Sequence, residues 1–594
     1  MAAGPVITWS DNISSTPKAS CMRKIGTLTL SRILLGLIFL VAISLRVLGI
    51  NAGLPLFIFV PDELTIVRGA MEVWESAVPE GLGWPGTFYM FVLSLSYLVY
   101  FLLGNASDVV AGLTGDWVGL LGAFDEFYVR FYTAPTIQYI IARLWSVLFG
   151  TATVLLVFLV ARRLYGAAAG LMAAGLLAVL PLHISHSRLA VPDIAMTFFV
   201  TASFYYVSRT LETRRDNDYW LAAVMVGLAV SNKLNGGIAY LTLVFGHLAS
   251  SNYVWSSVWR RLLNRRLMVA TGIAMLTFYM ATPYLATAPT VVLKELAFSI
   301  LSEGTREISF GTLRETLWDV LDGLGLVALV GSGLAIGWLF SKKERNDRPI
   351  KLILLISLIY LLPFAVSPRR SEYYLLPILP MVCIMASYGF LNTWNQISLS
   401  FPRLAWMRFT LIAIVVPLLA FSGTGNLSTA MRLYEVDAGA LAKRWIEENI
   451  PAGTRIAVED SRVPLTKNTV SIERTLARLK DDVLIRNEKA RRIAGLEEYP
   501  ATAFSNVVVN DEKVIQRQYE FLLLATERHR LPLLSYDVIT FTGGSYVLSI
   551  TRPELYRIVE NGDVDYIVSV HINDELGDLI MEWPGIYLYA RRTE

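Results

Sequence analysis

Long apolar runs recur along the sequence and constrain the fold more than any other feature. A helix of about 17–25 apolar residues crosses the hydrocarbon core of a bilayer. Such runs lie at 30–50, 139–161, 168–186, 191–209, 267–287, 320–340, 350–367, 371–391 and 408–425, and the run 219–250 is long enough for two spans. Only helices and closed barrels satisfy the backbone within lipid. We therefore predict a polytopic α-helical membrane protein with about 11 spans.

Composition agrees with a membrane protein and argues against several other classes. Of the 594 residues, 54% are hydrophobic and 17% are charged, whereas soluble domains carry about 25% charged residues. The net charge of +3 provides no general basic surface, which argues against a nucleic-acid partner. Cys21 and Cys383 lie far apart, so neither a disulfide framework nor a zinc site is indicated.

The two ends of the chain differ from the apolar middle. Residues 1–29 are polar, and the run that follows lacks a small-residue cleavage site, which predicts a cytoplasmic tail and a retained anchor. The membrane domain is predicted at 30–429. From 430 to 594 charges are frequent, and short β-rich runs alternate with helical patterns, which predicts a soluble α/β domain. The predicted strands are 455–460, 506–510, 546–551, 565–570 and 586–590.

Basic residues in short loops predict the orientation, because such loops tend to be cytoplasmic. They include Arg23 and Lys24, Arg162 and Arg163, Arg209, Arg214 and Arg215, Arg260, Arg261, Arg265 and Arg266, and Lys342, Lys343 and Arg345. If 86–104 crossed the membrane, the basic N-terminus and the 162–163 loop would fall on opposite sides. We therefore predict that 86–104 lies along the outer face or re-enters it, with a true span as the alternative. The C-terminal domain is then outside, and we favour a prokaryotic plasma membrane.

The same orientation gathers unusual polar residues at the outer ends of the spans. They are Asp62, Glu63 and Arg68 after the first run, His183, His186, Arg188 and Asp193 around the start of the fourth, Lys233 within 219–250, and Arg369, Arg370, Glu372 and Tyr373 near the start of 371–391. Ionisable groups at span ends are costly unless they are paired or face water. Their grouping therefore predicts a polar cavity at the outer face.

The residue types in this cavity suit a reaction on an anionic substrate. Arginine and lysine bind phosphate through charge-assisted hydrogen bonds, and a carboxylate can accept a proton from an acceptor hydroxyl. Together they fit glycosyl transfer from a lipid phosphate. The spacing alone also fits a secondary transporter or flippase for an anionic or lipid-linked solute, although no internal repeat typical of transporters is found. An inactive scaffold is a third reading.

Five motifs in order carry a resemblance to a known family. They are "PDE" at 61–63, "HSRLAVPD" at 186–193, "NKLNG" at 232–236, "TPY" at 282–284 and "RRSEYYLLPILP" at 369–380. The chain resembles, over residues 30–450, the C-type superfamily of integral-membrane glycosyltransferases. Within it the likeness is to the branch dependent on polyprenyl-phosphate sugars, which contains protein O-mannosyltransferases and the lipid A aminoarabinose transferase.

The resemblance implies an active site at the outer face, a polyprenyl-phosphate-linked donor, a protein, lipid or glycan acceptor, and inversion at the anomeric carbon. Juxtamembrane helices in the first outer loop of this family would account for 86–104. The motifs place the catalytic base at Asp62, with Glu63 beside it, and a second acid at Asp193. The substrate-binding candidates are Lys233, Arg370, Arg369, His186, Arg188, Arg143 and Tyr373. The transferred sugar is expected to be mannose or a related hexose or pentose.

Each candidate also has a structural reading. Asp62 and Glu63 can mark a solvated span end, and Asp193 can stabilise a helix N-terminus. Lys233 and Arg370 can extend to the membrane interface, and Arg143 and Arg46 can be paired internally. His183 and His186 can pack on one helical face. No cofactor is firmly indicated, although the two histidines with Asp193 leave a divalent metal possible.

Overall fold

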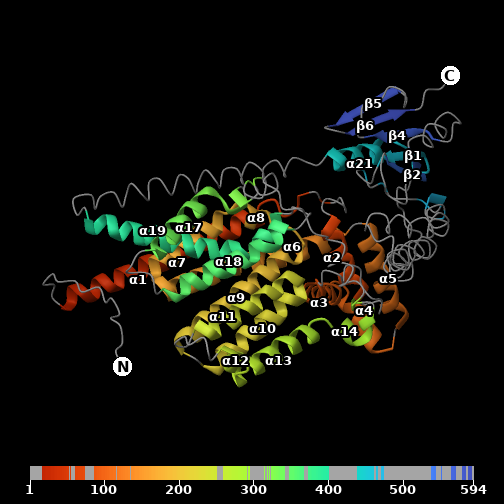
Figure 1. The fold of residues 1–594 in the computed structure, drawn as a ribbon. Coiled ribbons are helices and arrows are strands. Elements are labelled where there is room, and N and C mark those ends of the chain that lie inside the picture. The colour runs from red at the N-terminus through yellow and green to blue at the C-terminus, as the bar shows by residue number, and fades with distance from the viewer. Residues whose placement is uncertain are drawn as a thin grey trace.

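In the computed structural model, the described residues are 17–52, 54, 61–73, 86–115, 117–133, 135–213, 215–249, 258–290, 292–293, 314, 318, 320–321, 323–340, 347–366, 372–400, 438–459, 463, 465, 468, 470–471, 473, 537–542, 550–551, 564–569, 578–583 and 586–590. They form a helical bundle followed by a mixed sheet with its own helix (Figure 1). The predicted run 408–425 and the predicted strand 506–510 lie outside these residues.

The helices of the bundle mostly overlap the predicted apolar runs, but the first begins at Pro17, within the predicted polar tail, and those at 61–72, 106–113, 117–133 and 258–262 lie outside the runs. They are α1 (Pro17–Val47), α2 (Pro61–Glu72), α3 (Thr87–Gly104), α4 (Ala106–Leu113), α5 (Trp117–Thr133), α6 (Thr136–Tyr165), α7 (Ala167–Val179), α8 (Pro181–His186), α9 (Pro192–Thr213), α10 (Asp216–Asn232), η2 (Leu234–Ile238), α11 (Ala239–Ala249), α12 (Val258–Leu262), α13 (Arg265–Met280), α14 (Tyr284–Thr287), α17 (Leu326–Leu339), α18 (Arg348–Val366), η4 (Glu372–Ile378) and α19 (Leu379–Ser400). One large apolar core joins most of them.

Among the described helices, three are long and apolar enough to cross a membrane, namely α3, α6 and the continuous segment Glu372–Leu399. Shorter apolar helices, α7 and α17 among them, accompany these three. The architecture is therefore that of a multi-pass membrane protein, as the sequence predicts. The number of spans stays a prediction.

Two predicted apolar runs each form two helical segments, separated by a residue in an extended conformation. The run 168–186 divides at Leu180, whose extended conformation separates α7 from α8. Pro181 causes this break because proline disfavours the helical conformation in the residue before it. The run 219–250 divides at Lys233, also extended, into α10 and the η2–α11 segment. Both breaks place polar residues at helix ends.

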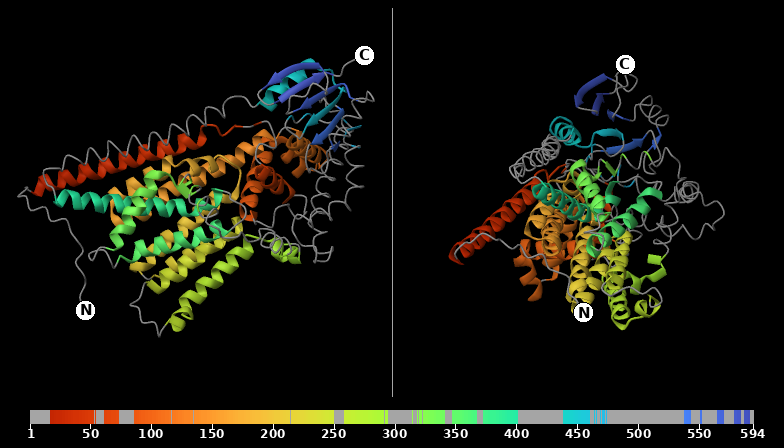
Figure 2. Two further views of the ribbon diagram at one scale, coloured as in Figure 1. Left: turned by 45° about the horizontal axis from the view of Figure 1, so that its top comes forward. Right: turned by 60° about the vertical axis from the view of Figure 1, so that its left-hand side comes forward.

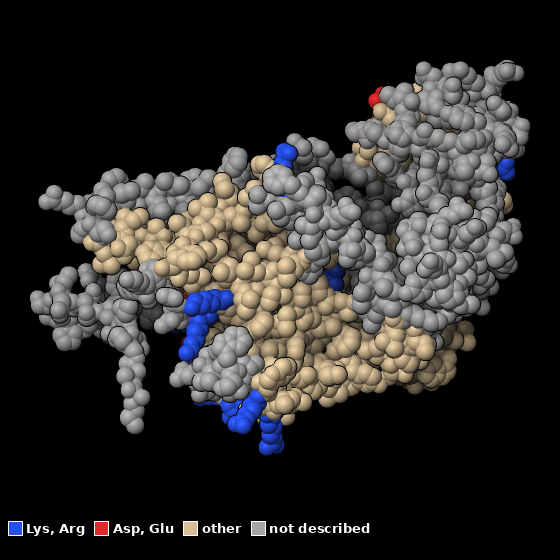
Figure 3. Space-filling model, in the orientation of Figure 1, with Lys and Arg blue, Asp and Glu red and all other residues tan. Residues whose placement is uncertain are grey.

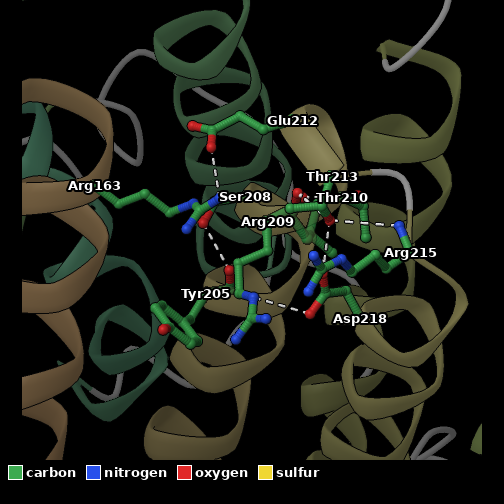
Figure 4. A network of polar contacts seen from close by, with 10 residues as sticks. Arg163, Tyr205, Ser208, Arg209, Thr210, Glu212, Thr213, Arg215 and Asp218 are labelled. Atoms are coloured by element: carbon green, nitrogen blue, oxygen red, sulfur yellow. Dashed lines mark hydrogen bonds and ion pairs between the residues drawn. The ribbon is translucent and has the colours of Figure 1, made fainter.

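Ion pairs join helices at one end of the bundle, where the predicted cytoplasmic loops meet. They are Arg163–Glu212 at 2.5 Å, Arg209–Asp218 at 2.9 Å and Arg266–Asp216 at 2.7 Å. Figure 4 shows the first two, between the end of α6, the end of α9 and the start of α10. Lys and Arg side chains also gather on the surface near α12 (Figure 3). The described basic loops thus share one end, which is called the basic end below.

Helix α3 has both of its termini at the opposite end of the bundle. At its start, the Thr87 hydroxyl donates to the Ser231 carbonyl at the end of α10. Near its other terminus, the Phe101 ring contacts Phe124 and Phe127 in α5 at centroid distances of 5.4 and 5.5 Å. Helix α5 leads directly into α6, whose basic terminus is its last turn. These contacts favour the predicted location of 86–104 along one face, which stays a prediction because α3 is itself long enough to cross.

The C-terminal sheet has six strands among the described residues, in the order β3-β2-β1-β4-β6-β5. The strands are β1 (Arg455–Glu459), β2 (Asp537–Thr542), β3 (Ile550–Thr551), β4 (Tyr566–Ser569), β5 (Asp578–Trp583) and β6 (Ile586–Ala590). Strands β1 to β4 pair in parallel, and β5 and β6 pair antiparallel. Helix α21 (Ala438–Asn449) packs its apolar face on the sheet. The sheet lies near the end of the bundle that holds α2 and α5 (Figures 1 and 2).

Four of the five predicted strand runs contain a strand or part of one, at β1, β3, β4 and β6, whereas the fifth, 506–510, is outside the described residues. The strands β2 and β5 were not predicted. The α/β character expected for this part is present, and its solubility, its outer location and the domain boundaries at 30 and 430 stay predictions.

Candidate active site

The two adjacent acids of "PDE" begin helix α2. Pro61 occupies the first helical position, where its missing N–H costs nothing. Asp62 and Glu63 lie in the first turn, where the helix macrodipole favours negative charge. Asp62 is half-buried, whereas Glu63 is completely buried. The two neighbouring carboxylates therefore occupy different environments and are suited to different tasks.

Glu63 is held by Arg143 from α6 in a two-pronged ion pair. Arg143 donates from Nε to Glu63 Oε1 at 2.8 Å and from Nη2 to Glu63 Oε2 at 2.6 Å. The backbone N–H of Ala190, between α8 and α9, also donates to Glu63 Oε1 at 2.6 Å. Both side chains are almost fully buried, Arg143 being 1% exposed. The Glu63 carboxylate therefore joins α2, α6 and the segment before α9.

Arg143 also binds the chain just after α1. Its Nη1 donates to the Ile50 carbonyl at 2.8 Å and to the Ala52 carbonyl at 2.7 Å. A guanidinium has five N–H donors, and these contacts together with Glu63 engage all three of its nitrogens. Arg143 is thus internally paired, which is one of the two readings that the sequence leaves open.

Asp193 and Lys233 form a second ion pair, nearer to the surface of the bundle. Lys233 Nζ donates to Asp193 Oδ1 at 2.7 Å, and the two side chains are 11% and 5% exposed. Asp193 lies in the first turn of α9, and Lys233 follows the last residue of α10. Both are therefore positioned by helix termini at the end opposite the basic loops.

Two tyrosine rings from η4 lie beside the Lys233 ammonium of this pair. The Lys233 Nζ lies 3.9 Å from the ring centroid of Tyr373 and 5.7 Å from that of Tyr374. A cation over an aromatic ring is attracted by its quadrupole, more strongly when water is excluded. Tyr374 was not among the predicted site residues, although its place beside Tyr373 in "EYYLLPILP" was a usable signal. The motif at 369–380, which contains η4, thus contacts the motif at 232–236, which contains Lys233.

The histidines of α8 separate into two environments. His186 is half-buried, and its ring lies 6.3 Å from that of Tyr373, beside the Asp193–Lys233 pair. His183 is completely buried, and its Nδ1 is 2.8 Å from Nη2 of Arg46. Arg46 also donates to the carbonyls of Leu177 and Ala178 at the end of α7. His183 and Arg46 therefore tie α1 to the α7–α8 turn.

The segments that carry Asp62 and Asp193 meet at Gly86. A Cβ added to Gly86 would lie 2.7 Å from Ile66 Cδ1 in α2 and 3.5 Å from Pro192 Cγ at the start of α9. Thr87 beside it bonds Ser231, two residues before Lys233. The start of α3 thus links the elements that bear the two acids and the lysine, and a larger residue at 86 would require the Ile66 side chain to move.

The remaining predicted residues fall into three groups. Arg188 donates through Nε and Nη2 to the Leu45 carbonyl, and burial lowers the pKa of its guanidinium. Arg68 lies 3.5 Å from Glu72 within α2. Arg369 and Arg370 lie outside the described residues. Within the part of the chain that the structure describes, no group of three or more His, Cys, Asp or Glu side chains is placed to hold a metal ion.

Part of the chain matches a known family in sequence. Residues 138–286 match the family model described as dolichyl-phosphate-mannose-protein mannosyltransferase. This segment runs from the start of α6 to α14 and contains Arg143, Asp193 and Lys233. It confirms the predicted resemblance to membrane glycosyltransferases that use polyprenyl-phosphate-linked sugars. A comparison with curated protein sequences finds no match.

Three solved structures are similar to this chain at sequence identities between 11% and 16%. ArnT from Cupriavidus metallidurans in the apo state has 15% identity and a TM-score of 0.47, covering 96% of this chain and 98% of that one. The same protein bound to undecaprenyl phosphate has 16% identity and a TM-score of 0.45 with the same coverage. The oligosaccharyltransferase AglB from Archaeoglobus fulgidus, in complex with an inhibitory peptide and a dolichol-phosphate, has 11% identity and a TM-score of 0.44, covering 91% of this chain and 69% of that one. These likenesses are too distant to transfer the roles of residues.

Proposed function

We propose that this chain is an inverting glycosyltransferase that moves a sugar from a polyprenyl-phosphate carrier to an acceptor hydroxyl at the outer membrane face. The observation that carries the proposal is the arrangement of two acids and a lysine at one end of the bundle. Asp193 binds Lys233 directly, and the residue beside Asp62 binds the Ala190 N–H three residues before Asp193. Sequence similarity of residues 138–286 to mannosyltransferases supports the same chemistry.

The proposed reaction is a single displacement at the anomeric carbon. The acceptor oxygen forms a bond to that carbon while the bond from the carbon to the phosphate oxygen breaks. The acceptor proton passes to the carboxylate of Asp62, and polyprenyl phosphate departs with the bonding electrons. Asp62 suits the role of base because it is half-buried at the start of α2, whereas both Glu63 oxygens are engaged.

Lys233 is proposed to stabilise the departing phosphate. Its ammonium is nearly buried, where a charge acts more strongly on developing negative charge than it does in water. Asp193 orients this ammonium, and the Tyr373 ring lies beneath it. Arg370, with Arg369, is proposed as the second phosphate ligand on the strength of the motif alone. His186 lies beside Tyr373 in the same region, Arg188 is proposed as a further substrate-binding residue on the strength of the motif alone, and Arg143 takes no direct part in phosphate binding in this proposal.

The donor is proposed to be a polyprenyl-phosphate-linked sugar, with mannose the first to test because of the matched family. The acceptor is a protein, lipid or glycan hydroxyl. We propose a prokaryotic plasma membrane as the location, with the sheet domain and the site outside. A transporter is the alternative, and the gathering of the candidate residues at one end of the bundle, away from its middle, favours the enzyme.

Transfer by purified protein in nanodiscs tests the proposal. Wild type and Asp62→Asn are supplied with a panel of polyprenyl-phosphate sugars and candidate acceptors, and free polyprenyl phosphate is measured. We expect release by wild type from one donor and a loss of kcat of about 10²–10⁴-fold in Asp62→Asn, with donor KM little changed. Normal turnover by Asp62→Asn contradicts the assignment of the base, and absence of release from every donor contradicts the enzyme reading.

A further inference from the structure

The buried contact between Glu63 and Arg143 joins four segments that are distant in sequence. Glu63 belongs to α2, Arg143 to α6, the carbonyls of Ile50 and Ala52 to the chain after α1, and the N–H of Ala190 to the segment before α9. The hydrogen bonds made by the Glu63 and Arg143 side chains have donor–acceptor distances between 2.6 and 2.8 Å.

Stability alone explains this contact poorly. Removing two charges from water is costly, and apolar residues of similar volume often stabilise a protein as well as a buried ion pair does. Fixing a unique arrangement of the chain is the better-attested use of such a pair. Here the arrangement is specific, because a two-pronged guanidinium–carboxylate contact restrains orientation as well as distance.

The restrained segments are those that carry the two proposed acids. Glu63 immediately follows Asp62, so fixing its carboxylate fixes the first turn of α2. The Ala190 N–H lies three residues before Asp193, which holds Lys233. One carboxylate thus restrains the proposed base and the proposed phosphate-binding pair relative to each other.

We propose that Glu63 and Arg143 are positioning residues, which hold the Asp62 turn and the Asp193 turn in register for catalysis. The inference rests on the proposed glycosyltransferase function. Glu63 does not exchange protons with substrate, because both oxygens accept internal hydrogen bonds. Arg143 does not bind donor phosphate, because its nitrogens are engaged by Glu63 and two carbonyls.

Paired substitutions separate positioning from folding. Glu63→Gln leaves the Arg143 charge buried without its counterion, so thermal stability should fall. The double variant Glu63→Leu/Arg143→Met removes both charges, so its thermal midpoint should recover towards that of wild type. The matched control is Glu126→Gln, which breaks the exposed pair with Arg130 on α5 and should change neither stability nor turnover.

Kinetics of the folded double variant decide between the two roles. A positioning role predicts that kcat stays about 10- to 100-fold low while donor KM is nearly unchanged, since small misplacements of catalytic groups have effects of that size. Return of kcat together with the thermal midpoint would overturn the inference. If the double variant does not fold, Arg143→Lys keeps the charge but cannot reach the carboxylate and both carbonyls, and normal kcat in that variant overturns it equally.

A labelling measurement that needs no activity distinguishes failure of this inference from failure of the proposed function. Cysteine replaces Asp62 in a chain carrying Cys21→Ser and Cys383→Ala, and its rate of reaction with a charged thiosulfonate reagent is measured. We expect Arg143→Lys, which keeps the local net charge, to change that rate severalfold and Glu126→Gln to leave it unchanged. Equal rates in all three backgrounds overturn the positioning role, whether or not wild type transfers sugar.

Discussion

At the scale of single residues, burial and hydrogen bonding distinguish the charged side chains at the end of the bundle opposite the basic loops. Glu63 is fully engaged by Arg143 and the Ala190 N–H, whereas its neighbour Asp62 is half-buried at the turn that meets the start of α9. The Asp193–Lys233 pair is less buried than the Glu63–Arg143 pair. For the proposed enzyme, we therefore expect a polar substrate to reach the second pair at a smaller cost of rearrangement than the first.

Removing Lys233 is expected to destabilise the protein and to weaken donor use. Lys233→Met leaves the nearly buried Asp193 carboxylate without its counterion, which costs about 3–5 kcal/mol when a buried pair is broken. The thermal midpoint should fall and donor kcat/KM should fall with it. Asp193→Asn/Lys233→Met should recover the midpoint but not kcat/KM.

Tryptophan fluorescence during heating and steady-state kinetics measure these two effects. Arg130→Gln, which breaks an exposed pair on α5, is the control and should behave as wild type. Recovery of kcat/KM in the double variant would show that Lys233 serves folding alone.

The sequence predicts which residues of the site need partners but not which partners they find. Arg143 and Lys233 lie within the predicted apolar runs 139–161 and 219–250, where an ionisable group must be paired or face water. Their partners lie 80 and 40 residues away, and no local pattern identifies contacts over such separations. The motif resemblance alone assigns the base to Asp62. The structure adds that Glu63 is completely buried and bound by Arg143, whereas Asp62 is half-buried.

At the scale of elements, close approach of helices depends on small residues. Gly331 in α17 faces α19, and a Cβ added to it would lie 2.6 Å from Phe390 Cε2 and 2.7 Å from Ala386 Cβ. Gly389 of α19 approaches the α17 backbone at the same contact. Helices in membranes pack through such small residues because the backbones then approach closely. This contact fixes α19, the helix that directly follows η4 with Tyr373 and Tyr374.

Filling that contact should loosen the bundle, whereas the same change elsewhere on α17 should not. Gly331→Ala forces its neighbours to move, and overpacking of this kind costs about 1–3 kcal/mol. Gly337→Ala meets no atom within 4 Å and gains helix propensity. The thermal midpoint in detergent should therefore fall for Gly331→Ala and stay level or rise for Gly337→Ala. Equal midpoints would contradict the packing described for α17 and α19.

Helices with long apolar runs and strands with regular alternation of apolar and polar residues can be predicted from the sequence. Elements without such a pattern cannot. Most described helices coincide with apolar runs, and the breaks at Pro181 and Lys233 follow from proline and from polar residues. Strand β5 was missed because its register shifts between Leu579 and Met581, and a bulge disrupts the alternation that identifies strands. Strand β2 carries β-branched residues in "DVITFT", a signal that would have identified it.

At the scale of the whole molecule, the bundle has two chemically different ends. Arginine pairs join α6, α9, α10 and α13 at one end. The acids, the lysine and the tyrosines of the proposed site meet at the other. Because basic loops tend to remain cytoplasmic, this separation agrees with the prediction that the proposed site lies outside.

Labelling of single cysteines in sealed vesicles tests the arrangement. In the background Cys21→Ser/Cys383→Ala, Arg260→Cys lies exposed at the basic end and Glu126→Cys lies exposed on α5. An impermeant thiol reagent added outside right-side-out vesicles should label residue 126 and not residue 260. Labelling of residue 260 and not of residue 126 would contradict the proposed orientation of the bundle.

The most direct test of the central claim is the stoichiometry of transfer by purified protein in nanodiscs. Glycosylated acceptor and free polyprenyl phosphate are measured together after a single turnover of the donor that wild type accepts. The account predicts that both products appear in equal amounts with wild type and that neither forms with Asp62→Asn. Absence of both products with wild type, together with movement of the intact lipid-linked sugar across the membrane of liposomes that contain the protein, would contradict it and identify a transporter.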